Sequence, residues 1–578
     1  MRKQAFDTLY NVFEVIRSAK LYDVCIVGSG AAGGMAAKVL TEAGCSVVML
    51  EAGPLLDPAK HYTEHLWPYQ LPHRGAGIGG SGMNASGSYE LDVAHIAGTI
   101  AGEPYLNAPG SQFHWTRGRI LGGRTNHWNC VALRFSDHDL RTRSLKGYGE
   151  DWPIRYEELA PYYDRVESLI GVHGTREGLA GAPDGVFLPP PVPRCSDLLI
   201  KQGCAKLRVP CIAGRAAVIT KPHNGRLACH YCAQCTQGCH TASRFSASQV
   251  LIPAAVKTGK LTLVPNAMAR EILLDKKGKA AGVSYIDKGT ATEQRVKVRA
   301  VILGASTCES ARLLLNSRST LFPNGLANSS GAVGRYLMDT SAHMVAGDFP
   351  QLAAIPPHNH DGTGSVHVYI PWWKYERENG FQGGYHVEIF GGPVMPKVGM
   401  FRREAQESEG YGLALRNRCK ERYPTSIQLD GRGEMVPNPA SFCEIDPAGT
   451  VDRWGIPVLR FHLKWSASEI AMAKDMRLSL EEIAVAAGGT PVPSSPHPEF
   501  GYLNPGGVAH EVGTVRMGAD PGTSVLNGFC QAHAVKNLFV TDGACFTTSP
   551  DKNPTLSILA LSWRASDYIL DQAKKGEI

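Results

Sequence analysis

Residues 22–53 read YDVCIVGSGAAGGMAAKVLTEAGCSVVMLEAG, and this stretch decides the fold. Residues 22–27 are typical of a short buried strand, a helical pattern then runs to about Ala43, and residues 46–50 form a second apolar run that ends at Glu51. Between the first strand and the helix lies a glycine-rich loop, with glycines at Gly28, Gly30 and Gly33. The order strand, glycine loop, helix, strand and acid predicts a Rossmann-like βαβ unit.

This unit predicts the binding of a dinucleotide. The glycines allow a tight turn and let the backbone approach a pyrophosphate, and the helix N-terminus offers free N–H groups and positive potential. Glu51 is placed to accept a hydrogen bond from a ribose hydroxyl. The sequence Glu51-Ala-Gly53 directly after the second strand is more typical of FAD than of NAD, and a second diphosphate pattern for NAD is not evident.

Length and composition narrow the class of protein. A chain of 578 residues is too long for one core and predicts two or three domains. A net charge of +6 is small for this length and no run of Lys and Arg stands out, which argues against a nucleic-acid-binding protein. No apolar stretch reaches the length of a membrane span.

Residues 1–20 predict an amphipathic helix. Phe6, Leu9, Phe13 and Ile16 share one face, which is expected to pack on the body of the protein or to dock to a partner or membrane surface. The segment has neither a continuous apolar stretch nor a twin-arginine pair, so we expect no signal peptide of its own. The expected location is therefore the cytoplasm, or the periplasm if the folded chain is exported with a partner that carries the signal.

Four of the 15 cysteines are clustered in residues 229–239, CHYCAQCTQGC, at positions Cys229, Cys232, Cys235 and Cys239. In a large enzyme such density predicts a metal site rather than disulfides, with zinc or an iron–sulfur cluster as the candidates. Zinc ribbons usually separate two cysteine pairs by a longer loop, which this segment lacks. The spacing is similar to that of bacterial ferredoxins, where the fourth cysteine serves another cluster, and this favours three ligands from the segment.

Four further segments resemble the glucose–methanol–choline (GMC) oxidoreductase family, and the resemblance runs from Tyr22 to about Asp571. They are residues 118–128 (GRILGGRTNHW), 510–518 (HEVGTVRMG), 538–543 (LFVTDG) and 541–555 (TDGACFTTSPDKNPT). The resemblance implies an α/β fold, with a Rossmann-like FAD-binding domain and a discontinuous α+β substrate domain that contains an antiparallel sheet. It also implies that the residues beside FAD include Gly122, Gly123, Asn126, His127, Asp542 and Gly543.

His510 and Asn553 match the catalytic pair of the family. Hydride leaves a carbinol carbon readily only if the hydroxyl proton also leaves, and histidine is a suitable base for that proton. Asn553 is expected to bind and orient the same oxygen. Pro554 suits the first turn of a following helix over residues 557–569, whose positive end would point at the flavin. The alternative is a buried structural histidine with a helix-capping asparagine.

His127, within Thr-Asn-His-Trp, resembles the histidine that tethers FAD covalently in pyranose 2-oxidases. Many relatives with similar strings hold FAD without a covalent bond. The alternative is therefore a histidine packed near the dimethylbenzene edge of the flavin.

Residues 151–172 and 313–339 resemble the catalytic subunits of the bacterial FAD-dependent glucoside 3-dehydrogenases. The resemblance implies oxidation of a ring 3-hydroxyl of glucosides, a small accessory subunit and a cytochrome-type electron acceptor. Cys229, Cys235 and Cys239 have the C-x5-C-x3-C spacing of the [3Fe–4S] cluster in related FAD-dependent glucose dehydrogenases. Cys232 is extra, and either supplies a fourth ligand to a [4Fe–4S] cluster or stands free.

The expected FAD domain comprises residues 21–135, 226–340 and 498–574, and the substrate domain comprises residues 136–225 and 341–497. The pocket-forming part is expected at about 340–500, whose aromatic and polar side chains include Trp372, Trp373, Tyr375, Tyr385, His386 and Glu388. The alternation in residues 383–391 fits a half-buried strand equally well, so no substrate residue is assigned.

Three other functions remain open. The first is an oxygen-using sugar oxidase of the pyranose-oxidase type, with idle cysteines. The second is an enzyme that oxidises a non-sugar alcohol, such as a sterol. The third is a flavoprotein without redox turnover, like the hydroxynitrile lyases of the family. A bound cluster would argue against the first and the third.

Overall fold

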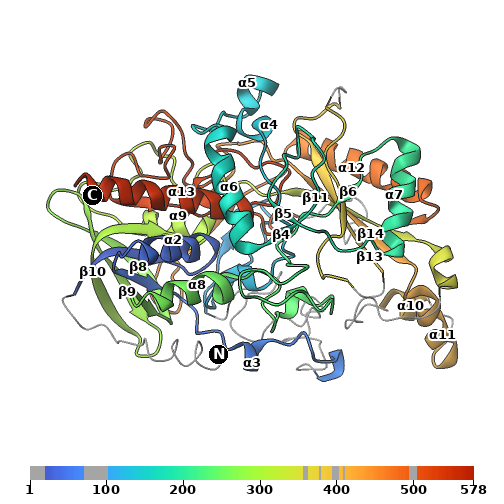
Figure 1. Ribbon diagram of the computed structural model, residues 1–578. Coiled ribbons are helices and arrows are strands. Elements are labelled where there is room, and N and C mark those ends of the chain that lie inside the picture. The colour runs from blue at the N-terminus through green and yellow to red at the C-terminus, as the bar shows by residue number, and fades with distance from the viewer. Residues whose placement is uncertain are drawn as a thin grey trace.

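The computed structural model describes residues 20–70, 100, 102–355, 362–375, 379–392, 402–407, 410–493 and 504–578. Apart from Lys20, the amphipathic helix expected over residues 1–20 lies outside the described residues. The described residues form two large sheets side by side, each with its own helices, and two small sheets of three and two strands (Figure 1).

A seven-stranded sheet is built from segments far apart in the sequence. Its strands are β1 (Leu21–Val27), β2 (Val47–Leu50), β7 (Leu261–Val264), β8 (Ala267–Leu274), β9 (Ala280–Asp287), β10 (Thr292–Leu303) and β18 (Leu538–Val540). The order is β7-β2-β1-β10-β9-β8, and β18 pairs with the end of β10. Strands β7, β2, β1, β10 and β18 run parallel, whereas β9 and β8 form an antiparallel extension.

Three helices pack together beside this sheet. They are α2 (Ala31–Glu42), α8 (Ala247–Lys257) and α13 (Thr555–Lys574), and α2 contacts both of the others (Figure 1). Small residues of α2 allow the close packing, since a Cβ at Gly34 would lie 3.1 Å from the Cβ of Ala247. The helix that follows the glycine loop, α2, is therefore packed between α8 and the C-terminal helix α13.

The second sheet is antiparallel and has six strands, in the order β17-β11-β14-β13-β12-β6. They are β6 (Ile212–Ala213), β11 (Ser341–Asp348), β12 (Val368–Ile370), β13 (Tyr385–Gly391), β14 (Ser426–Gly433) and β17 (Thr490–Pro493). Helices α7 (Cys195–Leu207) and α12 (Ala467–Ala486) cover one face and share a core with Tyr385, Val387 and Ile389 of β13. Because side chains alternate along a strand, His386 and Glu388 face the other way.

The remaining elements surround these two sheets. The helices and 3-10 turns are α3 (Pro58–His61), η1 (Pro68–Gln70), η5 (Gly123–Asn126), α4 (Asp137–Leu140), α5 (Thr142–Lys146), α6 (Tyr156–Ile170), η6 (Cys235–Gln237), α9 (Thr307–Asn316), η7 (Pro350–Ala354), α10 (Arg402–Glu407), α11 (Leu413–Arg422) and η8 (Gly543–Cys545). The strands are β3 (Leu106–Asn107), β4 (Val172–His173), β5 (Phe187–Leu188), β15 (Phe442–Ile445) and β16 (Leu459–His462).

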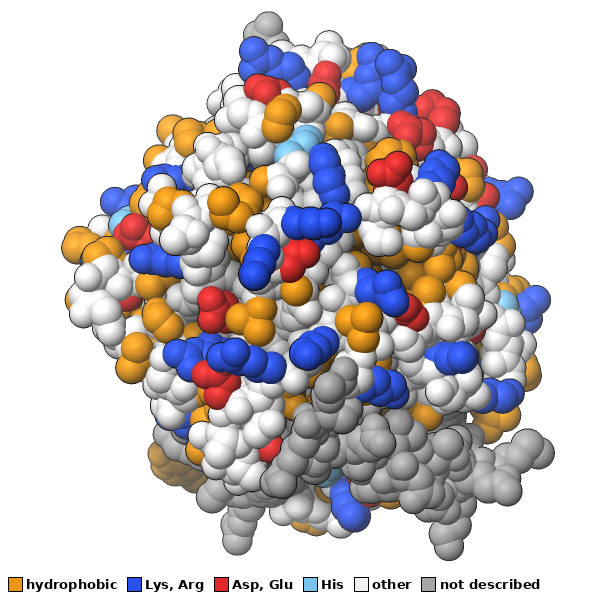
Figure 2. Space-filling model, turned by 90° about the vertical axis from the view of Figure 1, so that its left-hand side faces the viewer, with side chains coloured by type: hydrophobic (Ala, Val, Ile, Leu, Met, Phe, Trp, Pro, Cys, Tyr) orange, Lys and Arg blue, Asp and Glu red, His pale blue; other side chains and the backbone are white. Residues whose placement is uncertain are grey.

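The mixed α/β class and the antiparallel sheet are confirmed. All seven strands of the first sheet fall in the segments expected for the FAD domain, and all six of the second fall in those expected for the substrate domain. The domain boundaries themselves stay a prediction. Within the described ranges, no helix combines the length and apolarity that crossing a bilayer needs. On the face shown in Figure 2, Lys and Arg side chains alternate with acidic, apolar and uncharged ones.

Candidate active site

The glycine loop leaves an open space at the N-terminus of α2. A Cβ at Gly28, whose φ is +93°, would lie 2.4 Å from the carbonyl oxygen of Gly304, and one at Gly33 would lie 1.9 Å from that of Gly28. A Cβ at Gly30 would meet nothing within 4 Å. Gly28 and Gly33 are therefore required by protein packing, whereas Gly30 borders space that a phosphate group can occupy.

Glu51 links the glycine loop to the end of β2 through hydrogen bonds. Its Oε2 accepts hydrogen bonds from the backbone N–H (3.2 Å) and the hydroxyl (2.5 Å) of Ser29, and its Oε1 accepts one from the N–H of Gly53 at 2.7 Å. Burial raises the pKa of the Glu51 carboxyl, although these hydrogen bonds oppose the shift. A carboxylate has capacity for further donors, so the role of Glu51 toward a ribose hydroxyl stays a prediction.

Residues 118–128 lie against the glycine loop. The hydroxyl of Ser29 accepts a hydrogen bond from the N–H of Gly122 at 2.8 Å, and a Cβ at Gly123 would lie 3.5 Å from the Cα of Gly30. Asn126 is fully buried, and it donates to the carbonyls of Leu121 and Gly123. The amide of Asn126 thus holds the loop in shape.

Asn126 also accepts a hydrogen bond from the Ser248 hydroxyl at 2.7 Å, which joins the loop to α8. His127 follows directly and is half-buried at the end of η5. Its covalent bond to FAD stays a prediction.

Asp542 and Gly543 connect β18 to the region after β10. The Oδ2 of Asp542 accepts hydrogen bonds from the N–H of Ser306 at 3.0 Å and the hydroxyl of Ser310 at 2.6 Å. Burial raises the pKa of Asp542 to about 6, against the effect of these donors. A Cβ at Gly543 would lie 2.6 Å from the Thr307 hydroxyl, so the backbone packs closely there.

The structure brings His510 and Asn553 together. The Asn553 Nδ2 lies 3.5 Å from the His510 Nε2 and donates to the Glu388 Oε1 at 3.0 Å. Because a carboxylate only accepts, Glu388 fixes which end of the amide is the nitrogen. The Asn553 Oδ1 is buried and has no hydrogen-bond partner among the described residues. The pair therefore presents a base and an amide to one place.

Asp339 and Thr340 hold His510 in position. The backbone N–H of His510 donates to the Asp339 Oδ1 at 2.9 Å, and its Nδ1 lies 3.1 Å from the Thr340 hydroxyl. With Nδ1 protonated and donating to Thr340, Nε2 keeps its lone pair for a substrate proton. Asn553 directly precedes Pro554, the N-cap of α13, so the positive end of this helix lies at the site.

The imidazole of His510 is neutral at physiological pH. Burial, with a smaller contribution from the positive charges of Arg432 and Arg124, lowers the pKa of His510 to about 3, against the opposing effect of Glu388. A neutral imidazole is the form that accepts a proton, so this environment suits a general base.

A chain of buried charges runs behind Asn553. The Oε1 of Glu388 lies 3.5 Å from the His386 Nε2, the His386 Nδ1 lies 3.4 Å from the Asp551 Oδ2, and the Asp551 Oδ1 accepts from Lys552 at 2.6 Å. Burial opposes ionisation of Glu388, but the charges of Arg432 and His386 outweigh it and lower the pKa of Glu388 to about 2. This carboxylate therefore stays ionised beside the catalytic amide.

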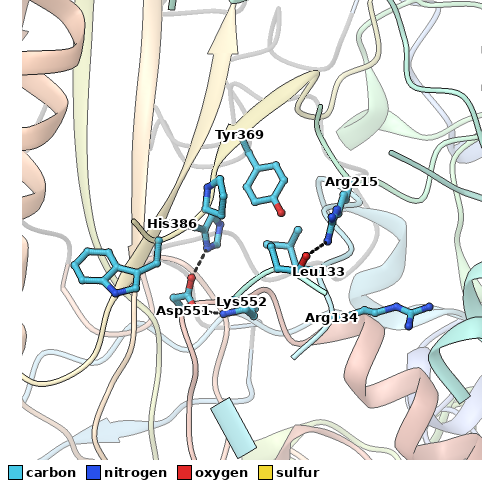
Figure 3. A pocket seen from close by; sticks show the side chains of 11 residues that line it. Leu133, Arg134, Arg215, Tyr369, His386, Asp551 and Lys552 are labelled. Atoms are coloured by element: carbon cyan, nitrogen blue, oxygen red, sulfur yellow. Dashed lines mark hydrogen bonds and ion pairs between the residues drawn. The ribbon is translucent and has the colours of Figure 1, made fainter. Parts of the chain in front are cut away.

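A small cavity adjoins this chain. His386, Asp551 and Lys552 line it from one side, and Tyr369 and Arg215 line it from the other (Figure 3). The Tyr369 hydroxyl is buried and has no hydrogen-bond partner within the described ranges. The cavity therefore offers hydrogen-bonding groups at the edge of the antiparallel sheet, next to the catalytic pair.

The four clustered cysteines lie on one loop beside residues 118–128. The guanidinium of Arg244 donates to the carbonyls of Thr125 and Trp128, at 2.9 and 3.1 Å. Its charge also acts on Cys235, but burial has the larger effect and raises the pKa of that thiol to about 12. The structure describes all four cysteines, and no three of their sulfur atoms lie within 4.8 Å of one another. The ligands of a single tetrahedral ion would lie that close together. This spacing argues against a single zinc ion at the four cysteines, and an iron–sulfur cluster there stays a prediction.

Sequence reasoning did not assign Glu388, Arg432 or Asp339 to the site, and it named Glu388 only among residues of the expected pocket. One signal was present, because the apolar residues of 385–391 alternate with His386 and Glu388. Arg432 comes near the site only through the pairing of β14 with β13. Asp339 reaches His510 only through the loop after Leu337.

Comparisons with known proteins place the chain in a family. Sequence models of the GMC oxidoreductases match residues 22–341 and residues 439–562, which include His510 and Asn553. The chain belongs to the GMC oxidoreductase family. It is accordingly an oxidoreductase that acts on CH–OH groups and binds FAD, and the role of the glycine loop in holding FAD stays a prediction.

Two relatives match over almost their whole length. The chain is 31% identical to a 2-methyl-1,2-propanediol dehydrogenase of Mycolicibacterium austroafricanum, with 96% of each chain covered. It is 26% identical to a fructose dehydrogenase large subunit of Gluconobacter japonicus, with 96% of this chain and 98% of the relative covered. Among solved structures, the formate oxidase of Aspergillus oryzae shares the fold at a TM-score of 0.64 and 14% identity, with 96% of this chain and 99% of that one covered.

Glu388→Gln tests how the catalytic amide is held. We expect kcat to fall about 10- to 100-fold, since a hydrogen bond to a charged group contributes about 1.5–3 kcal/mol. The matched control is Glu434→Gln, a buried carboxylate that instead contacts Lys146 and Tyr148. Steady-state kinetics at equal flavin content measure the difference. An unchanged kcat in Glu388→Gln would show that Asn553 is held without this carboxylate.

Proposed function

We propose that the protein is an FAD-dependent sugar dehydrogenase that oxidises a ring hydroxyl to a ketone, with the 3-hydroxyl of glucosides as the preferred position. The proposal also states that electrons leave through an iron–sulfur cluster at Cys229, Cys235 and Cys239 to a partner protein. The position of the cysteine loop carries it, since Arg244, five residues after Cys239, donates to the carbonyls of Thr125 and Trp128, and its charge acts on Cys235.

His510 and Asn553 have different roles in the proposed reaction. A substrate hydroxyl that enters between His510 and Asn553 donates its proton to the His510 Nε2 and accepts from the Asn553 amide. FAD, when bound, supplies the acceptor for the hydride from the carbinol carbon. Glu388 stays negative and favours the positive charge that His510 gains, while Arg432 opposes it.

Several observations support a sugar as substrate. The fructose dehydrogenase large subunit is similar along almost the whole chain. Tyr369, Trp372 and Arg215 line a cavity beside Lys552 that is only large enough for a water molecule, and side chains of these types also suit a sugar ring and its hydroxyls. The same relative is a large subunit, which supports a small accessory subunit for this chain. The proposal also includes a cytochrome-type acceptor, and a location either in the periplasm, by export with a signal-bearing partner, or in the cytoplasm.

The cluster type is part of the proposal. Cys229, Cys235 and Cys239 would hold a [3Fe–4S] cluster, and a fourth bond from Cys232 would make it [4Fe–4S]. The backbone N–H of Tyr231 donates to the Cys229 sulfur at 3.3 Å, a contact of the kind that tunes such clusters.

The test is an anaerobic absorbance spectrum with iron analysis, before and after addition of methyl glucoside. We expect bleaching of the flavin and about three or four irons per chain. Cys235→Ser should lose the iron and keep the flavin, whereas Cys195→Ser, at an exposed cysteine outside the loop, should keep both. Flavin without iron in the wild-type protein would overturn the electron relay and favour an oxygen-using oxidase.

A second candidate is the oxidation of a small non-sugar diol. The 31% identity to the 2-methyl-1,2-propanediol dehydrogenase favours it. Anaerobic bleaching by that diol, but not by glucosides, would select this function and leave the roles of His510 and Asn553 unchanged.

A further inference from the structure

A second group of metal-ligand side chains lies beside the cysteine loop, outside the active site. It consists of Glu64, His65 and His240, each of which offers one ligand atom, and these three atoms lie within 4.8 Å of one another. The rings of His65 and His240 meet edge to face, with centroids 5.0 Å apart. Neither the glycine loop nor the catalytic pair uses any of these residues.

Packing of the backbone brings the three residues together. The N–H of Thr63 donates to the carbonyl of Gln237 at 3.0 Å, and the N–H of His240 donates to the Glu64 Oε1 at 2.6 Å. Gly238, with a φ of +114°, packs against Tyr62, where a Cβ would lie 2.4 Å from the ring. The arrangement is therefore built into the contact between residues 62–65 and residues 237–240.

The charge of Glu64 points to a cation. The residue is 6% exposed, its Oε1 contacts the His240 Nδ1 at 2.5 Å, and its Oε2 is buried with no hydrogen-bond partner among the described residues. Among the described residues, His240 is the only basic side chain within 4.0 Å of the carboxylate, so no lysine or arginine lies there to balance its charge. A buried carboxylate without a balancing charge is costly, so a bound cation would stabilise it.

We propose that Glu64, His65 and His240 bind a divalent transition-metal ion of the zinc type. Two imidazoles and one carboxylate suit first-row transition metals, whereas Mg²⁺ and Ca²⁺ prefer oxygen ligands. His65 is exposed, so the ion reaches the site from solvent and keeps positions for water. The ion connects residues 64–65 to the end of the cysteine loop.

The other cluster of ligand-type side chains differs in charge. Asp139, Glu434 and Asp551 also lie within 4.8 Å of one another. Lys552 contacts Asp139 and Asp551, and Lys146 contacts Glu434. These ammonium groups already supply the positive charge, so this second cluster needs no metal.

Zinc binding to the holoenzyme tests the proposal. Tag-free protein with bound flavin is treated with a chelator, dialysed against increasing Zn²⁺ and analysed for zinc and iron per chain. We expect one saturable zinc site in the wild-type protein, and at least a tenfold loss of affinity in both His65→Gln and His240→Gln. The matched control is His230→Gln, because His230 is exposed in the same cysteine loop but lies outside the group. It should bind zinc as the wild type does.

The cysteines are the rival zinc site, and His65 separates the two possibilities because it lies outside their loop. Its side chain is exposed, so His65→Gln is expected to fold and to keep its flavin spectrum. Zinc binding of unchanged affinity in His65→Gln would assign the ion to the thiols and overturn the proposal. A wild-type protein without a saturable zinc site would overturn it as well.

Discussion

His510→Ala is expected to lower kcat/KM by about 10²- to 10⁴-fold, which is the usual contribution of a general base. The structure gives the reason. Asp339 accepts a hydrogen bond from the backbone N–H of His510, Thr340 contacts the Nδ1 of its ring, and the Nε2 faces the amide of Asn553. Removal of the ring leaves the substrate hydroxyl with no base at that position, and the barrier rises by about 3–5 kcal/mol.

The control is His533→Ala, at a histidine in the same C-terminal region that contacts Ser524 instead. Both variants should bind FAD at the wild-type ratio, and only His510→Ala should lose activity. Anaerobic flavin reduction in a stopped-flow instrument measures the chemical step directly. If His510→Ala reduced its flavin at the wild-type rate, the base would have to be another group.

The wild-type pH profile follows from the same environment. With a pKa of about 3, His510 is already deprotonated throughout the range from pH 5 to pH 8. Protonation of His510 therefore removes activity only as the pH falls toward 3, and His510 itself should give kcat/KM no acid limb near 6.5, the ordinary pKa of histidine. Burial raises the pKa of Asp339 to about 7, so the test compares the wild type with Asp339→Asn. A single-proton loss near pH 6.5 that persists in Asp339→Asn would contradict the lowered pKa of His510.

Local motifs made part of this fold predictable from the sequence. The strand, glycine loop and helix of residues 22–43 are formed by residues adjacent in the chain, and the structure places β1 and α2 there. Residues 538–540 form β18, at the start of the segment 538–543 that resembles the family. In each case the signal is a short apolar run followed by residues that permit a tight turn.

The surroundings of the catalytic pair were not predictable in the same way. Glu388 reaches Asn553 across 165 positions, and Asp339 reaches His510 across 171. Such contacts depend on how the antiparallel sheet is placed against the FAD-binding half, and no local pattern encodes that placement. The same is true of Glu64 and His240, which are 176 positions apart.

The other large effect is expected at the glycine loop, where Gly30→Ala should cost most of the FAD affinity. Nothing in the protein lies within 4 Å of a Cβ at this position, and its φ of −68° suits alanine, so the apoprotein should fold normally. The new methyl group would enter the space at the N-terminus of α2 where the pyrophosphate binds. Overpacking of this kind costs about 1–3 kcal/mol, which corresponds to about a 5- to 150-fold weaker affinity for FAD.

Variants of two other glycines distinguish a specific loss of FAD affinity from a general loss of stability. At Gly410 a Cβ also meets nothing within 4 Å, so Gly410→Ala should keep both FAD and stability. At Gly33 a Cβ would lie 1.9 Å from the carbonyl of Gly28, so Gly33→Ala should lower the melting temperature of the apoprotein as well as FAD binding. Flavin titration and thermal unfolding of the three apoproteins measure both quantities. Wild-type FAD affinity in Gly30→Ala would mean that the pyrophosphate does not pass over Gly30, and the cofactor would have to lie elsewhere on the loop.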